Sequence, residues 1–158
     1  MQTYKLKNNV YILEGFSMVG LLEGKGPLKD YFDYVIQDDT LKEKTFEKSE
    51  RKLLYDLIIN AIDKAGLKIT DIDFFIGGDL LNQIVSSSFT ARELNLPFIG
   101  LYSACATMTE SLAIGGIFVD NKIANNIVAS TCTHFSSAER QYRFPLELGN
   151  QRPPTAQW

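Results

Sequence analysis

The residue with the most distinctive chemical setting is Cys105. A short apolar run at residues 98–102 predicts a strand, and the mostly apolar residues after the cysteine predict a helix. Cys105 is therefore expected at a helix N-terminus, beside unpaired backbone N–H groups and the positive end of the helix dipole. Both favour thiolate over thiol, so the side chain could act as a nucleophile or contact an anion. The alternative is a small, buried hydrophobic residue, which is common for free cysteine.

The elements that would position Cys105 alternate along the chain. In the clearest helix, residues 53–65 place apolar side chains on one face, and Gly66 is suited to end it. Short apolar or alternating runs predict strands at residues 9–18, 72–76, 98–102 and 126–131. Shorter helices are predicted at residues 28–36 and 85–94, with loops at 20–26 and 38–48. This order predicts an α/β fold with a parallel sheet flanked by helices.

The helix after Cys105 is unusually apolar. It has only a thin polar stripe around Glu110, and a helix that is apolar nearly all round is buried on most sides. The adjacent Gly115 and Gly116 each weaken the helix by roughly 1 kcal/mol relative to alanine, which is tolerated where backbones approach closely. We therefore expect this helix to be packed between two layers, with a second layer beyond it.

The composition predicts one soluble globular domain, because the chain has 158 residues, of which 45% are hydrophobic and 22% charged. A net charge of −3 argues against a nucleic-acid partner, and no apolar run approaches the roughly 20 residues of a membrane span. The N-terminal residues do not resemble a signal peptide, so the two cysteines are expected to be reduced thiols in the cytoplasm. They lack metal-ligand spacing and the chain has one histidine, so we expect neither a metal nor another cofactor.

Several motifs together resemble one protein family. Residues 61–73 close a helix with Ala-Gly-Leu and open a strand with Asp-Ile-Asp, which, like the cysteine before a glycine-containing helix, resembles thiolase-like proteins. Within that superfamily, the similarity is to the stage V sporulation protein AD family. It is carried by four segments, GDLLNQ at 78–83, SACATM at 103–108, HFSSAERQYRFP at 134–145 and GNQRP at 149–153.

The resemblance implies a thiolase-like fold made of two similar halves, each with a mixed, mostly parallel sheet flanked by helices. The cysteine-bearing helix would lie buried in the central layer. Residues 1–158 correspond to the N-terminal half, so the thiolase-like domain is expected to be incomplete. In condensing thiolases the second half supplies the histidine, asparagine or second cysteine that assists the nucleophile. Without that half, one face of the helix would be exposed, and we expect a second copy in a homodimer, or another partner, to cover it.

The resemblance also implies a role in bacterial spore formation. The family is part of the machinery that takes dipicolinic acid, a small pyridine dicarboxylate, into the developing spore, and it is regarded as a soluble binding component without catalysis. The expected partners are dipicolinic acid and other stage V sporulation membrane proteins. The expected location is cytoplasmic, peripherally associated with the spore inner membrane.

A site for a dianion can be assembled from residues in these motifs. The candidate ligand-binding residues are Cys105, Asn82, Gln83, Asp79, His134 and Arg143. The helix terminus at Cys105 suits a carboxylate, as do the guanidinium groups of Arg140, Arg143 and Arg152. The amide side chains could orient a carboxylate or the ring nitrogen by hydrogen bonds.

Each of these residues also has a purely structural interpretation. Asn82 and Gln83 could satisfy backbone groups at a strand end, and Asp79 could cap the turn after its strand. His134 could hold a loop by hydrogen bonds, and the arginines could be solvated or paired with nearby glutamates. Cys132 fits the packing of its strand.

Two other functions stay open beside the binding component that we favour. The chain could descend from acyl-thioester transferases, such as thiolases or ketoacyl synthases, with Cys105 at the nucleophile position and no turnover by this half alone. It could also be a truncated or split-gene product that acts through a partner. These alternatives leave the question of enzymatic activity undecided.

Overall fold

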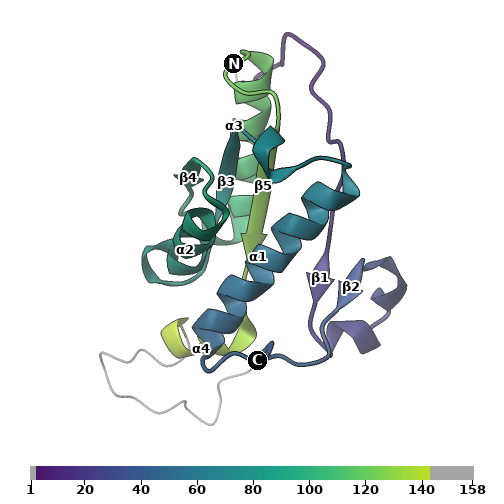
Figure 1. Ribbon diagram of the computed structural model, residues 1–158, viewed down its shortest axis with the longest axis vertical. Helices are drawn as coiled ribbons and strands as arrows, with labels where there is room; N and C mark the ends of the chain where they lie inside the picture. The colour runs from purple at the N-terminus through teal and green to yellow at the C-terminus, as the bar shows by residue number, and fades with distance from the viewer. Residues whose placement is uncertain (1–2, 143–158) are drawn as a thin grey trace.

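The computed structural model describes residues 3–142, and its centre is a three-stranded parallel sheet (Figure 1). The strands are β3 (Phe74–Asp79), β4 (Phe98–Gly100) and β5 (Ile127–Cys132), in the order β4-β3-β5. The β3–β5 register runs without interruption from Phe74 opposite Ile127 to Asp79 opposite Cys132. Because every pairing in this sheet is parallel, all three strands end at the same edge.

Helices cover both faces of this sheet (Figure 1). The helices are α1 (Phe46–Lys64), α2 (Val85–Leu94), α3 (Thr107–Asp120) and α4 (Phe135–Tyr142). Side chains of β3 alternate between the faces, so Phe75 packs with α1 and α2, whereas Phe74 meets Phe118 of α3 edge to face. The described residues thus form an α/β fold with parallel sheets flanked by helices. Among them, no helix combines the length and the apolar character that crossing a bilayer requires.

The core on the α1 side is built from apolar side chains at helical spacing. Leu54, Ile58 and Ile62 follow one another at single-turn intervals along α1 and are almost completely buried. They pack with Phe75 of β3 and Leu94 of α2. This packing fixes the orientation of α1 relative to the sheet, and with it the position of every polar residue on the same stripe.

A second, two-stranded parallel sheet lies beside α1 (Figure 1). It pairs β1 (Met18–Val19) with β2 (Tyr34–Val35), and 3₁₀ turns at Glu23–Lys25 and Lys29–Tyr31 lie between them. The prediction of a helix at residues 28–36 is therefore wrong. The Asp33 carboxylate accepts hydrogen bonds from the N–H and the hydroxyl of Ser17 at 2.8 and 2.9 Å, and these long-range bonds override the local helical pattern.

Most of the other predicted elements are present with shifted ends. The bounds of α2 are those predicted, and β3, β4 and β5 overlap the predicted apolar runs. Helix α1 starts inside the region predicted as a loop, because the Thr45 side chain accepts a hydrogen bond from the N–H of Lys48 and caps the helix. The sequence pattern does not predict α4. The predicted strand at residues 9–18 is wrong for most of its length, because only Met18 of this range lies in a strand.

Helix α3 is half buried, which corrects the prediction of a helix buried on most sides. Ser111 and Gly115 are buried, whereas Met108 and Leu112 are 40% and 38% exposed. A Cβ built on Gly115 would lie 3.4 Å from the Ile127 side chain, an ordinary contact, so no backbone crowds this glycine. Within residues 3–142, the outer face of α3 is not covered by a second layer.

Candidate functional site at the carboxyl edge of the sheet

Five of the predicted site residues lie where the parallel strands end. Asp79 is the last residue of β3, and Asn82 and Gln83 occupy the turn that follows it. Cys105 lies in the 3₁₀ turn Ala104–Ala106 between β4 and α3, and His134 follows β5. Ligands of open parallel sheets bind outside the carboxyl ends of the strands, so this edge is the candidate site. Arg143 and Arg152 lie outside the described residues, and their roles stay predictions.

The surface part of this edge is formed by the turns after β3 and β4. Asn82, Gln83 and Cys105 are all exposed. Three residues in these turns, Gln83, Ile84 and Ala104, have φ angles of 59°, 46° and 47°, so each turn contains left-handed backbone. The structure thus brings the amide pair and the thiol to one edge of the sheet, on the loops of neighbouring strands.

The N-terminus of α3 already has an acidic neighbour. No side chain caps this end of the helix, but Glu110 lies in its first turn and accepts a hydrogen bond from the Ser103 hydroxyl. An anion that binds near Cys105 would therefore share the helix dipole with the Glu110 carboxylate. In the sequence alone, Glu110 stands out only as part of a polar stripe.

Asp79 is buried and takes the structural role that the sequence also allowed. One carboxylate oxygen accepts from the N–H of Leu81 at 2.9 Å. The other accepts from the N–H and the hydroxyl of Ser87, both at 2.7 Å, which places the negative charge at the N-terminus of α2. Asp79 is 6% exposed, so its carboxylate faces the protein interior.

His134 is buried as well, and both of its ring nitrogens have partners. The Nε2 atom lies 2.6 Å from the backbone oxygen of Asp39, and Nδ1 accepts a hydrogen bond from the N–H of Ser136 at 3.2 Å. A carbonyl can only accept and an amide N–H can only donate, so these partners select the neutral tautomer with the proton on Nε2. The ring also stacks on Phe46 of α1, with centroids 5.2 Å apart. His134 thus connects the loop before α1 to the segment after β5.

Glu50 lies beneath this edge, and no sequence motif predicts its place there. It is fully buried in the first half of α1, accepts from the N–H of His134 at 3.0 Å and from the Ser137 hydroxyl, and lies 3.8 Å from the Cys132 sulfur. Burial raises the pKa of Glu50 to about 7, against the lowering effect of the Ser137 and His134 hydrogen bonds. The sequence does hold one signal that Glu50 is buried. It lies one helical turn before Leu54 and so continues the buried stripe of Leu54, Ile58 and Ile62 toward the N-terminus.

The two thiols have opposite surroundings, and this difference is testable. Burial, then the carboxylates of Glu50 and Asp79, raise the pKa of Cys132 well above its usual value, whereas Cys105 is exposed. We expect iodoacetamide at pH 8 to alkylate Cys105 about tenfold faster, or more, than Cys132 in the folded chain. Mass spectrometry of wild type and Cys105→Ser checks this. Equal labelling of both thiols under native conditions would contradict it.

The described residues give no sign of a metal site, because within 3–142 no three His, Cys, Asp or Glu side chains are grouped to hold an ion. The groups exposed at this edge include the amides of Asn82 and Gln83 and the thiol of Cys105, beside the start of α3. Behind them lie the buried polar side chains of Glu50, Asp79 and His134.

Comparison of the sequence with known proteins identifies its family. The sequence matches the family described as stage V sporulation protein AD (SpoVAD) over residues 1–158. It is 36% identical over 155 residues to stage V sporulation protein AD of Bacillus subtilis (strain 168), and the match covers 98% of this chain. The chain spans 46% of that relative's length. With its whole length matched, the chain belongs to the stage V sporulation protein AD family.

Proposed function

We propose that the chain contributes a binding surface for dipicolinic acid during spore formation, without catalysing a reaction. The observation that carries this proposal is the family match over residues 1–158, combined with a carboxyl edge where Asn82, Gln83 and Cys105 are exposed together. Two of the segments that carry the family resemblance, residues 78–83 and 103–108, lie at this edge.

The chemistry of this edge suits a flat dicarboxylate. One carboxylate of the ligand would accept hydrogen bonds from backbone N–H groups at the start of α3, and the amides of Asn82 and Gln83 would donate to the other or to the ring nitrogen. The charge of Asp79 is already engaged by Ser87 at the start of α2, so it does not face the ligand. Arg143 would add a bidentate contact and stays a prediction from the sequence.

The surroundings of Cys105 favour binding over catalysis. A thiol nucleophile needs a nearby base, and the chain's one histidine has both ring nitrogens engaged, by Asp39 and by Ser136. His134 is also buried, whereas Cys105 is exposed. This arrangement supports a role for Cys105 as part of a binding surface.

Calorimetric titration of the 158-residue chain tests the proposal. Dipicolinate should bind, and isophthalate, which has the same two carboxylates without the ring nitrogen, should bind more weakly. Asn82→Ala should weaken dipicolinate binding about tenfold, the equivalent of roughly 1.4 kcal/mol for one hydrogen bond to a charged group. Asn60→Ala, on the exposed surface of α1, is the matched control and should have no effect. Absence of dipicolinate binding, or equal loss with both variants, would contradict the proposal.

Acyl-thioester transfer is the second candidate, favoured by the exposure of Cys105 at the start of α3. It requires a covalent thioester on Cys105 after incubation with an acyl-CoA, visible as a mass increase that Cys105→Ser abolishes. Under the proposal above, intact-mass spectrometry shows no such adduct.

The proposal also includes assembly. Membership of the family supports an association with other stage V sporulation membrane proteins, peripheral to the spore inner membrane. The exposed apolar side chains of α3, Met108, Leu112 and Ile117, support a contact with a second copy or another partner. Dimerisation would appear in light scattering as a concentration-dependent mass.

A further inference from the structure

Helix α4 is joined to helix α1 by a buried polar contact, close to the start of α1 (Figure 1). Glu50 of α1 and Ser137 of α4 are both completely buried, and the Ser137 hydroxyl oxygen contacts one carboxyl oxygen of Glu50. The same carboxyl oxygen accepts a hydrogen bond from the N–H of His134 at 3.0 Å. We call the contact between Glu50 and Ser137 the latch, because it connects the segment after β5 to the first half of α1.

The latch can form in two ways, which differ in where one proton lies. The Ser137 oxygen also lies 2.9 Å from the backbone carbonyl oxygen of His134, and a hydroxyl group has only one hydrogen to donate. If Glu50 is protonated, its O–H donates to Ser137, and the Ser137 hydroxyl donates to the His134 carbonyl. If Glu50 is ionised, Ser137 donates to the carboxylate instead, and the carbonyl loses that bond. The protonated form therefore makes one more hydrogen bond than the ionised form.

The surroundings of Glu50 do not favour a negative charge. Among the side chains that the structure describes, no lysine or arginine pairs with it, and Arg51, the next residue along α1, is 40% exposed and pairs with Glu93 of α2 at 3.6 Å. The partners of the His134 ring keep that ring neutral. A charge on Glu50 would thus lie in the protein interior near the carboxylate of Asp79, which is costly. The titratable groups that face Glu50 from the packed elements are Asp79 of β3, Cys132 of β5 and His134 after β5.

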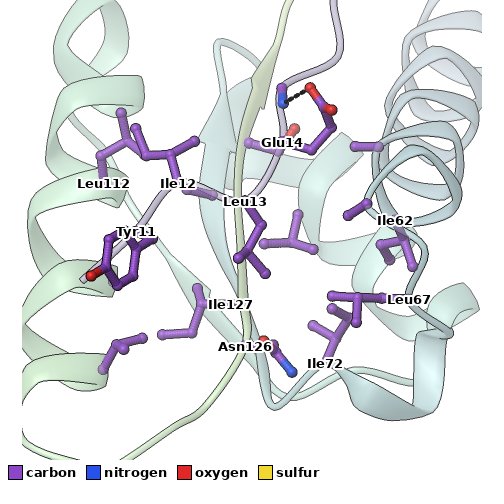
Figure 2. A pocket seen from close by; sticks show the side chains of 18 of the residues that line it. Tyr11, Ile12, Leu13, Glu14, Ile62, Leu67, Ile72, Leu112, Asn126 and Ile127 are labelled. Carbon is purple, nitrogen blue, oxygen red and sulfur yellow. Dashed lines mark hydrogen bonds between the residues drawn. The ribbon is translucent and has the colours of Figure 1, made fainter. Parts of the chain in front are cut away.

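Helix α1 is fixed in place along its length, so it cannot move away from such a charge. Two turns after Glu50, Ile58 is completely buried in the core between the helices and the sheet. Farther along, Ile62 lies with Leu67 and Ile72 on one side of an apolar pocket (Figure 2). Because this apolar packing extends over most of the helix, the position of the Glu50 backbone is set.

Helix α4 is held much less firmly. It has eight residues, a length at which an isolated helix is unstable in water. Within residues 135–138, the part of α4 whose burial is described, Ser137 is buried, whereas Phe135 is 55% exposed. His134 has an anchor of its own, because its ring lies 2.6 Å from the backbone oxygen of Asp39. A movement that relieves the buried carboxylate therefore begins after His134 and displaces α4.

We propose that the latch is a pH-sensitive switch, which holds α4 against α1 while Glu50 is protonated and releases α4 when Glu50 ionises. Release lets water reach the carboxylate, which removes the cost of burying its charge. Burial raises the pKa of Glu50 from 4.5 to about 7, so between these values the closed form keeps a proton that the open form loses. Closure of the latch therefore weakens as pH rises through this window. Because α4 follows β5, the switch changes the carboxyl edge of the sheet with pH.

Amide hydrogen exchange of the ¹⁵N-labelled 158-residue chain measures the release. The N–H of Ala138 donates to the His134 carbonyl at 3.0 Å in the first turn of α4, so its protection reports whether the helix is in place. Relative to the intrinsic exchange rate at each pH, we expect the protection of Ala138 to fall by about tenfold or more between pH 5 and pH 8. Its exchange should not accelerate in urea below the unfolding transition, because a local opening exposes little surface.

Two variants and a control isolate the latch. Glu50→Gln cannot ionise, and its amide N–H₂ donates to Ser137 as the protonated acid does, so the protection of Ala138 should be the same at both pH values. Ser137→Ala removes the latch, so the protection of Ala138 at pH 5 should fall by about tenfold. Asp63→Asn, at an exposed position of the same helix, should keep the wild-type pH dependence.

Three results would overturn the switch. The first is constant protection of Ala138 in the wild type between pH 5 and pH 8, and the second is an equal fall in Glu50→Gln. The third is exchange at Ala138 that accelerates with urea as steeply as at the buried Ile76 of β3, because it would show that only global unfolding exposes this amide. None of these measurements involves a ligand, so the outcome does not depend on dipicolinate binding.

Discussion

Replacing Gly77 with alanine should destabilise the chain by about 3 kcal/mol or more, a large part of the stability of an ordinary domain. Gly77 lies in the middle strand of the sheet, and a Cβ at this position would press against the Ser130 carbonyl of β5 and lie 2.9 Å from the Phe75 ring. Because the Ser130 carbonyl belongs to the backbone, no side-chain rotation can remove this clash, and β3 and β5 would have to move apart. Urea denaturation followed by circular dichroism measures the loss.

A second glycine provides the control for this result. A Cβ added at Gly20 would meet no heavy atom within 4 Å, and the residue has no positive φ, so Gly20→Ala should change stability by less than about 0.5 kcal/mol. Equal denaturation midpoints for Gly77→Ala and Gly20→Ala would contradict the close pairing of β3 and β5.

The second large effect concerns pH and Glu50. Its pKa rises from 4.5 to about 7 on folding, mainly because the carboxyl group is buried. Between these two values the folded chain keeps a proton that the unfolded chain releases, so stability falls as pH rises through this window. The contribution is fully present below pH 4.5 and is lost by about pH 7, a change of about 3 kcal/mol.

Glu50→Gln isolates this effect, because glutamine keeps the size of the protonated side chain and cannot ionise. We expect the variant and the wild type to be similar near pH 4.5 and the variant to be more stable by about 3 kcal/mol at pH 8. Asp63→Asn, an exposed carboxyl group on the same helix, should leave the pH profile unchanged. Parallel profiles for Glu50→Gln and wild type would show that Glu50 ionises as readily in the folded chain as in the unfolded one.

Much of the fold follows from local patterns in the sequence. The apolar stripe of α1 and the Gly66 that follows it, at φ 70°, are both where the spacing predicts them. The bounds of α2 match the predicted range 85–94, and Asn95, which follows the helix, takes the left-handed conformation that closes helices. These signals act over one or two helical turns, so a single sequence reveals them.

The errors come from interactions between distant residues. A helix is predicted at residues 28–36, but the hydrogen bond between Asp33 and Ser17 holds this segment beside β1, and β2 forms instead. The residues near position 33 give no sign of this distant partner. The same is true of the site. Asp79, His134 and Asn82 are equally polar in the sequence, but two of them turn inward to Ser87 and to Asp39, and Asn82 is exposed. Glu50 was missed because a charged residue on an apolar stripe is usually taken as its exposed border.

The most direct test of dipicolinate binding is a map of where the ligand contacts the protein. Backbone ¹H–¹⁵N spectra of the labelled 158-residue chain are recorded during titration with dipicolinate and, separately, with isophthalate. We expect saturable shifts confined to residues 81–84 and 103–108, larger with dipicolinate. Shifts centred outside these two segments, or no shifts at saturating dipicolinate, would contradict binding at the carboxyl edge.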